Sequence, residues 1–285
     1  ATISRLLNRS RDEGITRISV NLPQGVHSQL EEDLVASYDL RDAIVVDCDS
    51  ENEQINQRDV GAAAAYYVES TIKPNEVIGI SSWSSNLLAL VNAMHQVSRK
   101  PGVQVVQILG GVGNPGAEVH AERLTSRLAR LVNGRATFLP VPGIVGSQAS
   151  LDVLLADPYV EEAMTLFNQV SLALVGIGAV EPSELLADSG NIFSDEELNI
   201  LRSEGAVGDI LLHFFDENGE PVDTSLNNRV VSMSLSQLQK ADRSVGVAGG
   251  RRKFRSILGA LRGDLINVLI TDCFTASRLM DAASN

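Results

Sequence analysis

Short apolar runs recur along most of the chain, and stretches with helical spacing separate most of them. The runs are rich in β-branched residues and apolar at successive positions, which is typical of strands buried on both faces; they lie at 42–48, 76–81, 103–109, 136–142, 172–178, 209–215, 244–250 and 266–272. Helices are predicted over 52–71, 85–97, 121–133 and 251–263. This alternation predicts an α/β fold with a doubly wound, mainly parallel sheet and helices on both faces.

Residues 216–235 break the alternation. Asn218-Gly219 is a strong turn dipeptide, and it lies between two strand-like runs. We therefore expect a small antiparallel excursion from the parallel sheet. No run of Gly, Pro or Ser within residues 40–285 is long enough to be a linker, so these residues are expected to form a single domain.

The N-terminal residues follow a different pattern. An amphipathic helix that carries Arg5 and Arg9 ends at a glycine, and the alternating sequence after it is typical of a strand. The net charge is −13 for the whole chain but +2 over residues 1–17. A basic terminus on an acidic body is expected when the terminus belongs to another functional module, although a solvated helix face has the same composition.

Composition narrows the class of protein. Apolar residues make up 44% of the chain and charged residues 21%, which is typical of a globular protein with a substantial core. No apolar run approaches the ~18 residues of a membrane span. The two cysteines, Cys48 and Cys273, suit a reducing cytoplasm, where we expect the protein, and they cannot alone form a four-ligand zinc site. The acidic body argues against nucleic-acid or membrane binding by the bulk of the chain.

In parallel sheets of this type, ligands bind at the carboxyl ends of the strands. The predicted strand at 76–81 is followed by a hydroxyl-rich turn, and a helix begins directly after it. Hydroxyls and free N–H groups at a helix N-terminus favour an anion such as phosphate, whereas a single serine would only cap the helix. This turn offers more hydroxyls than a cap needs, and its candidate ligands are Ser81, Ser82, Ser84, Ser85 and Asn86.

Other strand ends carry glycines and charged residues. Glycine turns allow a ligand to approach the backbone closely, and the candidates are Gly111, Gly113 and Gly178. Their spacing is neither that of a dinucleotide-binding loop nor that of a Walker A loop. Each polar residue could instead be a cap or a solvated side chain, but convergence on one sheet edge favours a small-molecule site. The polar candidates are Lys253 for phosphate, and Asp209 and Asp272 for sugar hydroxyls.

Catalytic motifs are absent from the sequence. It contains no H-E-x-x-H, G-x-S-x-G or paired-cysteine signature. Of the four histidines, only His120 is near a glycine loop, and a position on a helix face explains it as well as a catalytic role does. We therefore predict no catalytic residue, no metal and no cofactor.

Several segments, in the order in which they occur, resemble the SorC family of bacterial transcriptional regulators over essentially the whole chain. They are ISRLLNRSRDEGI, VIGISSWSSNLLALVNAM, QILGGVGNP, ALVGIGAV, SGNIFSDEEL, GAVGDILLHFFDENGEPV, GVAGGRRK and VLITDCFTA. Each segment alone is weak, but their number and order are specific. One loop departs from the family pattern: many members have Ser-Trp-Gly-x-Thr, whereas here Trp83 is followed by Ser84, Ser85 and Asn86.

The resemblance implies a fold related to glucosamine-6-phosphate deaminase and ribose-5-phosphate isomerase, behind an N-terminal helix-turn-helix. It implies that residues 1–22 are the end of a DNA-recognition helix with the turn and strand that follow, and that Arg5 and Arg9 are remnants of a DNA contact. Residues 23–285 would be the sugar-binding effector domain. The earlier helices of the module are absent from this sequence, so we expect a fragment that binds operator DNA weakly by itself.

The resulting hypothesis is an effector-binding domain of a bacterial regulator of sugar or polyol catabolism. The resemblance implies that a sugar or polyol, in phosphorylated form by family precedent, binds to this domain and changes its affinity for operator DNA. It also implies that the protein is a dimer or tetramer. The alternative is a sugar-phosphate isomerase or deaminase on the same fold. Such an enzyme would have no use for the basic N-terminal helix.

Overall fold

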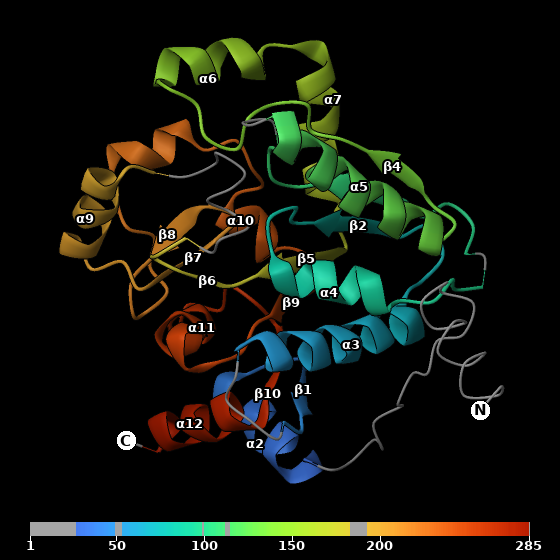
Figure 1. The fold of residues 1–285 in the computed structure, drawn as a ribbon, viewed down its shortest axis with the longest axis vertical. Coiled ribbons are helices and arrows are strands. Elements are labelled where there is room, and N and C mark those ends of the chain that lie inside the picture. Colours follow the sequence, from blue (N-terminus) through green and yellow to red (C-terminus); the bar gives the residue numbers. More distant parts are fainter. Residues whose placement is uncertain (1–26, 49–52, 99, 112–114, 183–192, 285) are drawn as a thin grey trace, which may run out of the picture.

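The computed structural model describes residues 27–48, 53–98, 100–111, 115–182 and 193–284 (Figure 1). The expected N-terminal helix and strand, with Arg5 and Arg9, lie outside these residues, and so does Gly113. Within the described part of the chain, no helix combines the length and the apolar character that are needed to cross a membrane.

A seven-stranded parallel sheet forms the centre of the fold, which confirms the predicted architecture. Its order is β1-β10-β9-β5-β2-β3-β4. Strand order reverses between β2 and β5, because the chain runs outward from β2 to β4 on one side and from β5 to β10 on the other. The strands are β1 (Asp42–Val46), β2 (Val77–Ile80), β3 (Gln104–Gln107), β4 (Arg135–Thr137), β5 (Leu172–Gly176), β9 (Arg243–Val247) and β10 (Val268–Asp272).

Helices cover both faces of this sheet and enclose two clusters of buried apolar side chains. On one face α3 (Glu53–Thr71), α4 (Ser85–Ala93) and α5 (Pro115–Leu131) lie side by side (Figure 1). The other cluster includes side chains from the remaining helices. These are α2 (Ser28–Tyr38), α6 (Gln148–Leu155), α7 (Pro158–Thr165), α9 (Asp195–Ser203), α10 (Leu235–Leu238), α11 (Phe254–Arg262) and α12 (Cys273–Ala283).

Three short strands form a second, antiparallel sheet: β6 (Gly178–Ala179), β7 (Gly208–Ile210) and β8 (His213–Phe215). The sequence predicted one continuous strand over 209–215, and this prediction is wrong, because the chain turns at Leu211-Leu212. Both leucines have positive φ, 58° and 65°, as in the type I′ turns that Asn-Gly usually forms. Both side chains are buried, so tertiary packing holds a turn that the local sequence disfavours.

The predicted turn at Asn218-Gly219 is present. Gly219 has a φ of 79°, and an antiparallel bridge pairs Phe215 with Pro221 around it. Pairing beyond this turn consists of isolated bridges. The small antiparallel sheet therefore precedes the segment in which the sequence placed it.

Candidate functional site

A pocket lies at the carboxyl ends of β2 and β5, where the strand order reverses. The loops after β2, β5 and β9 line it, together with the β7–β8 hairpin. This is the position at which doubly wound sheets bind ligands. Of the predicted ligand residues, the pocket brings together Ser81, Ser84, Ser85, Gly178, Asp209 and Lys253.

The serines lie at the N-terminus of α4. Ser84 is the N-cap residue, and its hydroxyl accepts a hydrogen bond from the backbone N–H of Leu87 (3.4 Å), so the capping role and the pocket-lining role coincide. Gly176 makes room for it, since a Cβ at that glycine would lie 2.4 Å from Ser84 Oγ. The N-terminus of the helix and the Ser85 hydroxyl therefore border the pocket, an arrangement that favours an anion.

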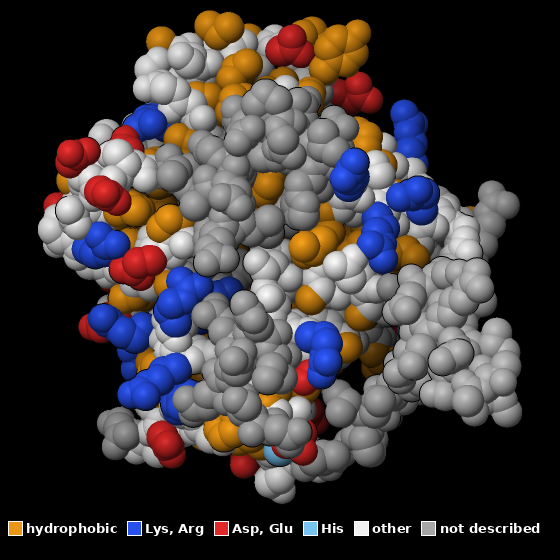
Figure 2. All heavy atoms as spheres, in the orientation of Figure 1, with side chains coloured by type: hydrophobic (Ala, Val, Ile, Leu, Met, Phe, Trp, Pro, Cys, Tyr) orange, Lys and Arg blue, Asp and Glu red, His pale blue; other side chains and the backbone are white. Residues whose placement is uncertain are grey.

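Positive charge gathers beside this pocket. Figure 2 shows Lys and Arg side chains clustered over α11 and the segment that leads into it, on a chain whose net charge is −13. Arg252 and Lys253, at the end of the β9–α11 loop, line the pocket. The guanidinium of Arg252 also lies 3.4 Å from the carbonyl oxygen of Glu181, another lining residue. Clustered cations next to a concave site attract anionic ligands.

Asp209 supplies a carboxylate to the same pocket. It lies in β7 opposite Gly178, and a Cβ at that glycine would be 2.0 Å from Asp209 Oδ1, so the absence of a side chain there creates the space for the carboxylate. Burial raises the pKa of Asp209 to about 6, although a hydrogen bond from the Leu212 N–H (3.1 Å) and the nearby charge of Lys253 oppose this effect. Near neutral pH this carboxyl group can therefore accept hydrogen bonds from hydroxyls, and at mildly acidic pH it can donate one.

The raised pKa should make stability depend on pH. Asp209 is protonated more readily in the folded state, where its pKa is about 6, than at its ordinary value of 3.8. Its contribution to stability is therefore complete below 3.8 and is lost as the pH rises through 6. Urea unfolding of the parent protein and of Asp209→Asn at several pH values should show the variant gaining stability relative to the parent between these limits. A stability difference that stays constant with pH would contradict the assignment.

Asp272 has a different environment from Asp209. It is fully buried and caps α12, and its carboxylate accepts hydrogen bonds from the N–H and hydroxyl of Thr275 (both 2.8 Å) and from the N–H of Gly250 (2.7 Å). It does not line the pocket. Asp272 therefore holds the glycine loop that presents Lys253, and its direct contact with a ligand hydroxyl stays a prediction.

Three other candidates also lie outside the lining. The hydroxyl-bearing Ser82 is fully buried, and the Asn86 amide donates to the carbonyl oxygen of Val247 (2.9 Å), which ties α4 to β9. The N–H of Gly111 donates to the Val141 carbonyl oxygen (2.9 Å). Asn86 and Gly111 therefore hold the loops around the pocket, whereas the buried Ser82 hydroxyl makes no hydrogen bond among the described residues, and a contact with ligand stays a prediction for all three.

The sequence analysis missed several lining residues. Trp83 lines the pocket and donates its indole N–H to the Gly110 carbonyl oxygen (3.1 Å). Arg252 belongs to the same cationic run as Lys253, so the run itself carried a usable signal. Gln57 reaches the pocket from α3, and nothing in its local sequence marks it.

The histidines do not add to this site. His213 lies in β8, where Nε2 is 2.9 Å from the Ser232 hydroxyl, and burial lowers the pKa of His213 to about 4, so the ring is neutral at pH 7. The side chain of His120, in α5, lies outside the part of the chain that the structure describes.

Comparison with known proteins identifies the family. Residues 23–281 match the family model described as "Putative sugar-binding domain". The chain is 30% identical over 283 residues to the sorbitol operon regulator of Klebsiella pneumoniae, covering 98% of this chain and 88% of that protein. It is 31% identical over 280 residues to the deoxyribonucleoside regulator of Bacillus subtilis, with the same coverage.

Solved structures agree with this result. The crystal structure of the full-length sorbitol operon regulator SorC from Klebsiella pneumoniae superposes with a TM-score of 0.82 at 29% identity, covering 98% of this chain and 89% of that one. The sugar-binding domain of a DeoR regulator from Pseudomonas syringae is 39% identical, with a TM-score of 0.71 and coverage of 90% and 100%. The relatives are named as regulators. The chain therefore belongs to the SorC family of transcriptional regulators, and it contains the family's effector-binding, sugar-binding domain.

Proposed function

We propose that the pocket binds a phosphorylated sugar or polyol and that this binding changes the affinity of the regulator for its operator DNA. One observation supports the proposal: a single pocket combines the N-terminus of a helix and two cationic side chains with a carboxylate. Two relatives are named for sorbitol and for deoxyribonucleosides, both of which are polyhydroxy compounds, and this supports the ligand class.

The proposed ligand has two ends that differ in chemistry. Its phosphate would take the hydroxyls of Ser84 and Ser85 and the charge of Lys253, because charge-assisted hydrogen bonds to phosphate are strong and directional. Its hydroxyls would donate to Asp209. Lys253 lowers the pKa of Asp209 through its charge, so a phosphate that engages Lys253 would also change the electrostatics of the carboxylate beside it.

We also propose that the domain is a binding module without turnover, in agreement with the regulatory relatives. The remaining alternative is an isomerase or deaminase acting in the same pocket. Incubation with any sugar phosphate that binds, followed by product analysis, separates the two, because only an enzyme would convert the ligand at a rate proportional to protein concentration.

Replacing Lys253 by Ala is expected to weaken the binding of a cognate sugar phosphate about tenfold or more, since a hydrogen bond to a charged group contributes about 1.5–3 kcal/mol. Titration calorimetry with sugar and polyol phosphates, each paired with its unphosphorylated form, measures the effect. The loss should be confined to the phosphorylated member of each pair. Lys240→Ala is the matched control, because Lys240 is exposed and lies outside the pocket. Unchanged affinity in Lys253→Ala would remove Lys253 from the phosphate site.

The division of the chain at residues 22 and 23 and the self-association of the protein are also proposals. Regulators that read paired half-sites need at least two copies of the DNA-binding module, so we propose a dimer or a tetramer. Light scattering at micromolar concentration should give at least twice the chain mass of 30.5 kDa. A monomer, both with and without ligand, would contradict this.

A further inference from the structure

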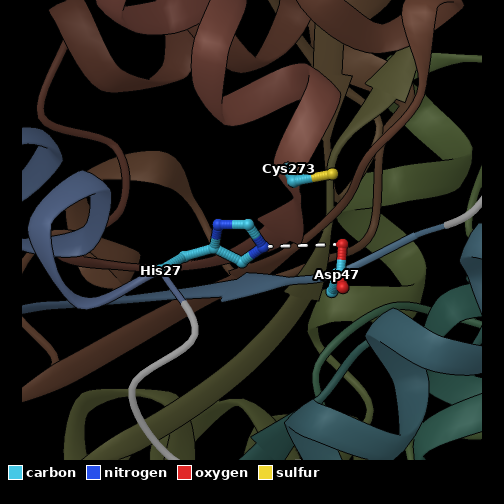
Figure 3. A group of neighbouring side chains, drawn as sticks. All are labelled: His27, Asp47 and Cys273. Carbon is cyan, nitrogen blue, oxygen red and sulfur yellow. Dashed lines mark ion pairs between the residues drawn. The ribbon is translucent and has the colours of Figure 1, made fainter.

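Three side chains from distant parts of the sequence point toward one another at the carboxyl ends of β1 and β10 (Figure 3). His27 directly precedes α2, Asp47 directly follows β1, and Cys273 is the first residue of α12. Their ligand atoms all lie within 4.8 Å of one another, and His27 Nε2 is 3.7 Å from Asp47 Oδ1. None of the three lines the sugar pocket.

We propose that His27 Nε2, Asp47 Oδ1 and Cys273 Sγ bind a divalent transition-metal ion of the zinc class. A nitrogen, a thiolate sulfur and a carboxylate oxygen are the three kinds of ligand that Zn²⁺ takes in proteins. Three protein ligands leave the fourth tetrahedral position to water.

The separations fit such an ion after a small adjustment. With bonds of about 2.0–2.3 Å, a tetrahedral zinc ion holds its ligand atoms about 3.3–3.7 Å apart. The distance between His27 Nε2 and Asp47 Oδ1, 3.7 Å, lies at the upper end of this range, and the other separations, at most 4.8 Å, need to close by no more than about 1.5 Å. The Asp47 side chain is 61% exposed, so it can move and gives the ion a route from solvent.

The surroundings and the charges of the three side chains also favour a bound cation. The Nε2 atom of His27 is buried and makes no hydrogen bond to any described residue, because the Asp47 carboxylate is 3.7 Å away, so a metal between the two would satisfy this polar atom. Cys273 is the first residue of the 11-residue helix α12, and a coordinated metal ion would itself displace the thiol proton. The thiolate and the Asp47 carboxylate together balance the charge of a divalent ion.

A metal at this position would connect the start of α2 to two strands of the sheet. α2 packs on β1 and on α12, and the backbone N–H of Val45 donates to the Glu31 carboxylate (2.8 Å) in the same region. The family match begins at residue 23, so the ion would fix the chain close to where it enters the sugar-binding domain. It would therefore stabilise the folded state in proportion to metal occupancy.

Cobalt binding tests the proposal, because Co²⁺ occupies zinc sites and a thiolate ligand gives it a charge-transfer band in the near ultraviolet. The purified chain would be stripped with a chelator, kept reduced with a phosphine and titrated with Co²⁺. We expect one ion per chain, a thiolate band, and displacement by Zn²⁺ but not by Mg²⁺, which disfavours sulfur. Zn²⁺ should also raise the melting temperature of the stripped protein.

Variants assign the ligands. Cys273→Ala should abolish the thiolate band, and His27→Ala should weaken binding more than about tenfold. Cys48→Ala is the matched thiol control and should keep the band. His95→Ala is the matched histidine control, because His95 also faces an acid, Glu69, in a pair without cysteine. Circular dichroism confirms that each variant is folded. The proposal is overturned by the absence of a thiolate band at saturating Co²⁺, by its persistence in Cys273→Ala, or by its loss in Cys48→Ala.

Discussion

Replacing Arg243 by Met is expected to lower the free energy of unfolding by about 3–5 kcal/mol, because it leaves a buried carboxylate without its cation. The guanidinium of Arg243, at the start of β9, donates to Glu76 and to Thr71, and it lies over the ring of Tyr67 at 5.9 Å. The side chains of Arg243 and Glu76 are only 4% and 3% exposed. Chemical denaturation of the two proteins measures the difference.

Matched substitutions separate this effect from a general loss of charge. Arg58→Met removes an arginine that is 80% exposed and pairs with its neighbour Asp59, and it should change stability by less than about 0.5 kcal/mol. A double variant, Arg243→Met with Glu76→Leu, should be less destabilised than Arg243→Met alone, because neither charge is then buried unpaired. Strictly additive losses would show that the pair is not coupled. The pair lies at the amino ends of β9 and β2, away from the pocket, so ligand affinity should not change.

Replacing Gly178 by Ala is expected to weaken the binding of the sugar ligand about 10- to 100-fold, because it removes one hydrogen bond between the ligand and a charged group. The added Cβ would lie 2.0 Å from Asp209 Oδ1, so the carboxylate must move from its place in the pocket. The atom that it meets is the end of a side chain and not backbone, so the fold should persist. Calorimetry with the sugar phosphate that the parent protein binds measures the loss.

Two comparisons make this prediction specific. Gly146→Ala is the matched control, since a Cβ there meets nothing within 4 Å, and it should bind the ligand as the parent does. If Gly178→Ala acts by displacing Asp209, the double variant Gly178→Ala with Asp209→Ala should bind no more weakly than Asp209→Ala alone. A further loss in the double variant would mean that Gly178 contributes in another way, such as direct backbone contact with the ligand.

Local sequence patterns were sufficient to predict the parallel sheet and most of the loops that meet at its carboxyl edge. Each parallel strand is a short apolar run, because both of its faces are covered, and this pattern is readable without any knowledge of the neighbouring strands. Since parallel strands end at the same edge, the loops after β2, β5 and β9 could be expected to meet, and they line one pocket. The β7–β8 hairpin was misread because two leucines with positive φ form its turn, and only core packing makes that conformation acceptable.

Asp209 and Asp272 show where the sequence stops being sufficient. Both are acidic residues beside an apolar run, and the sequence assigned them the same role. In the fold, Asp209 reaches the pocket because Gly178, 31 positions earlier in the chain, has no side chain in its way. Asp272 instead accepts hydrogen bonds from Gly250 and Thr275, which leave its carboxylate enclosed and already paired. The sequence by itself determined the sheet, the strand ends and the chemistry available at them. Which of those side chains face a ligand was decided only by the tertiary structure, because it depends on partners that are remote in sequence and leave no periodic or local signal.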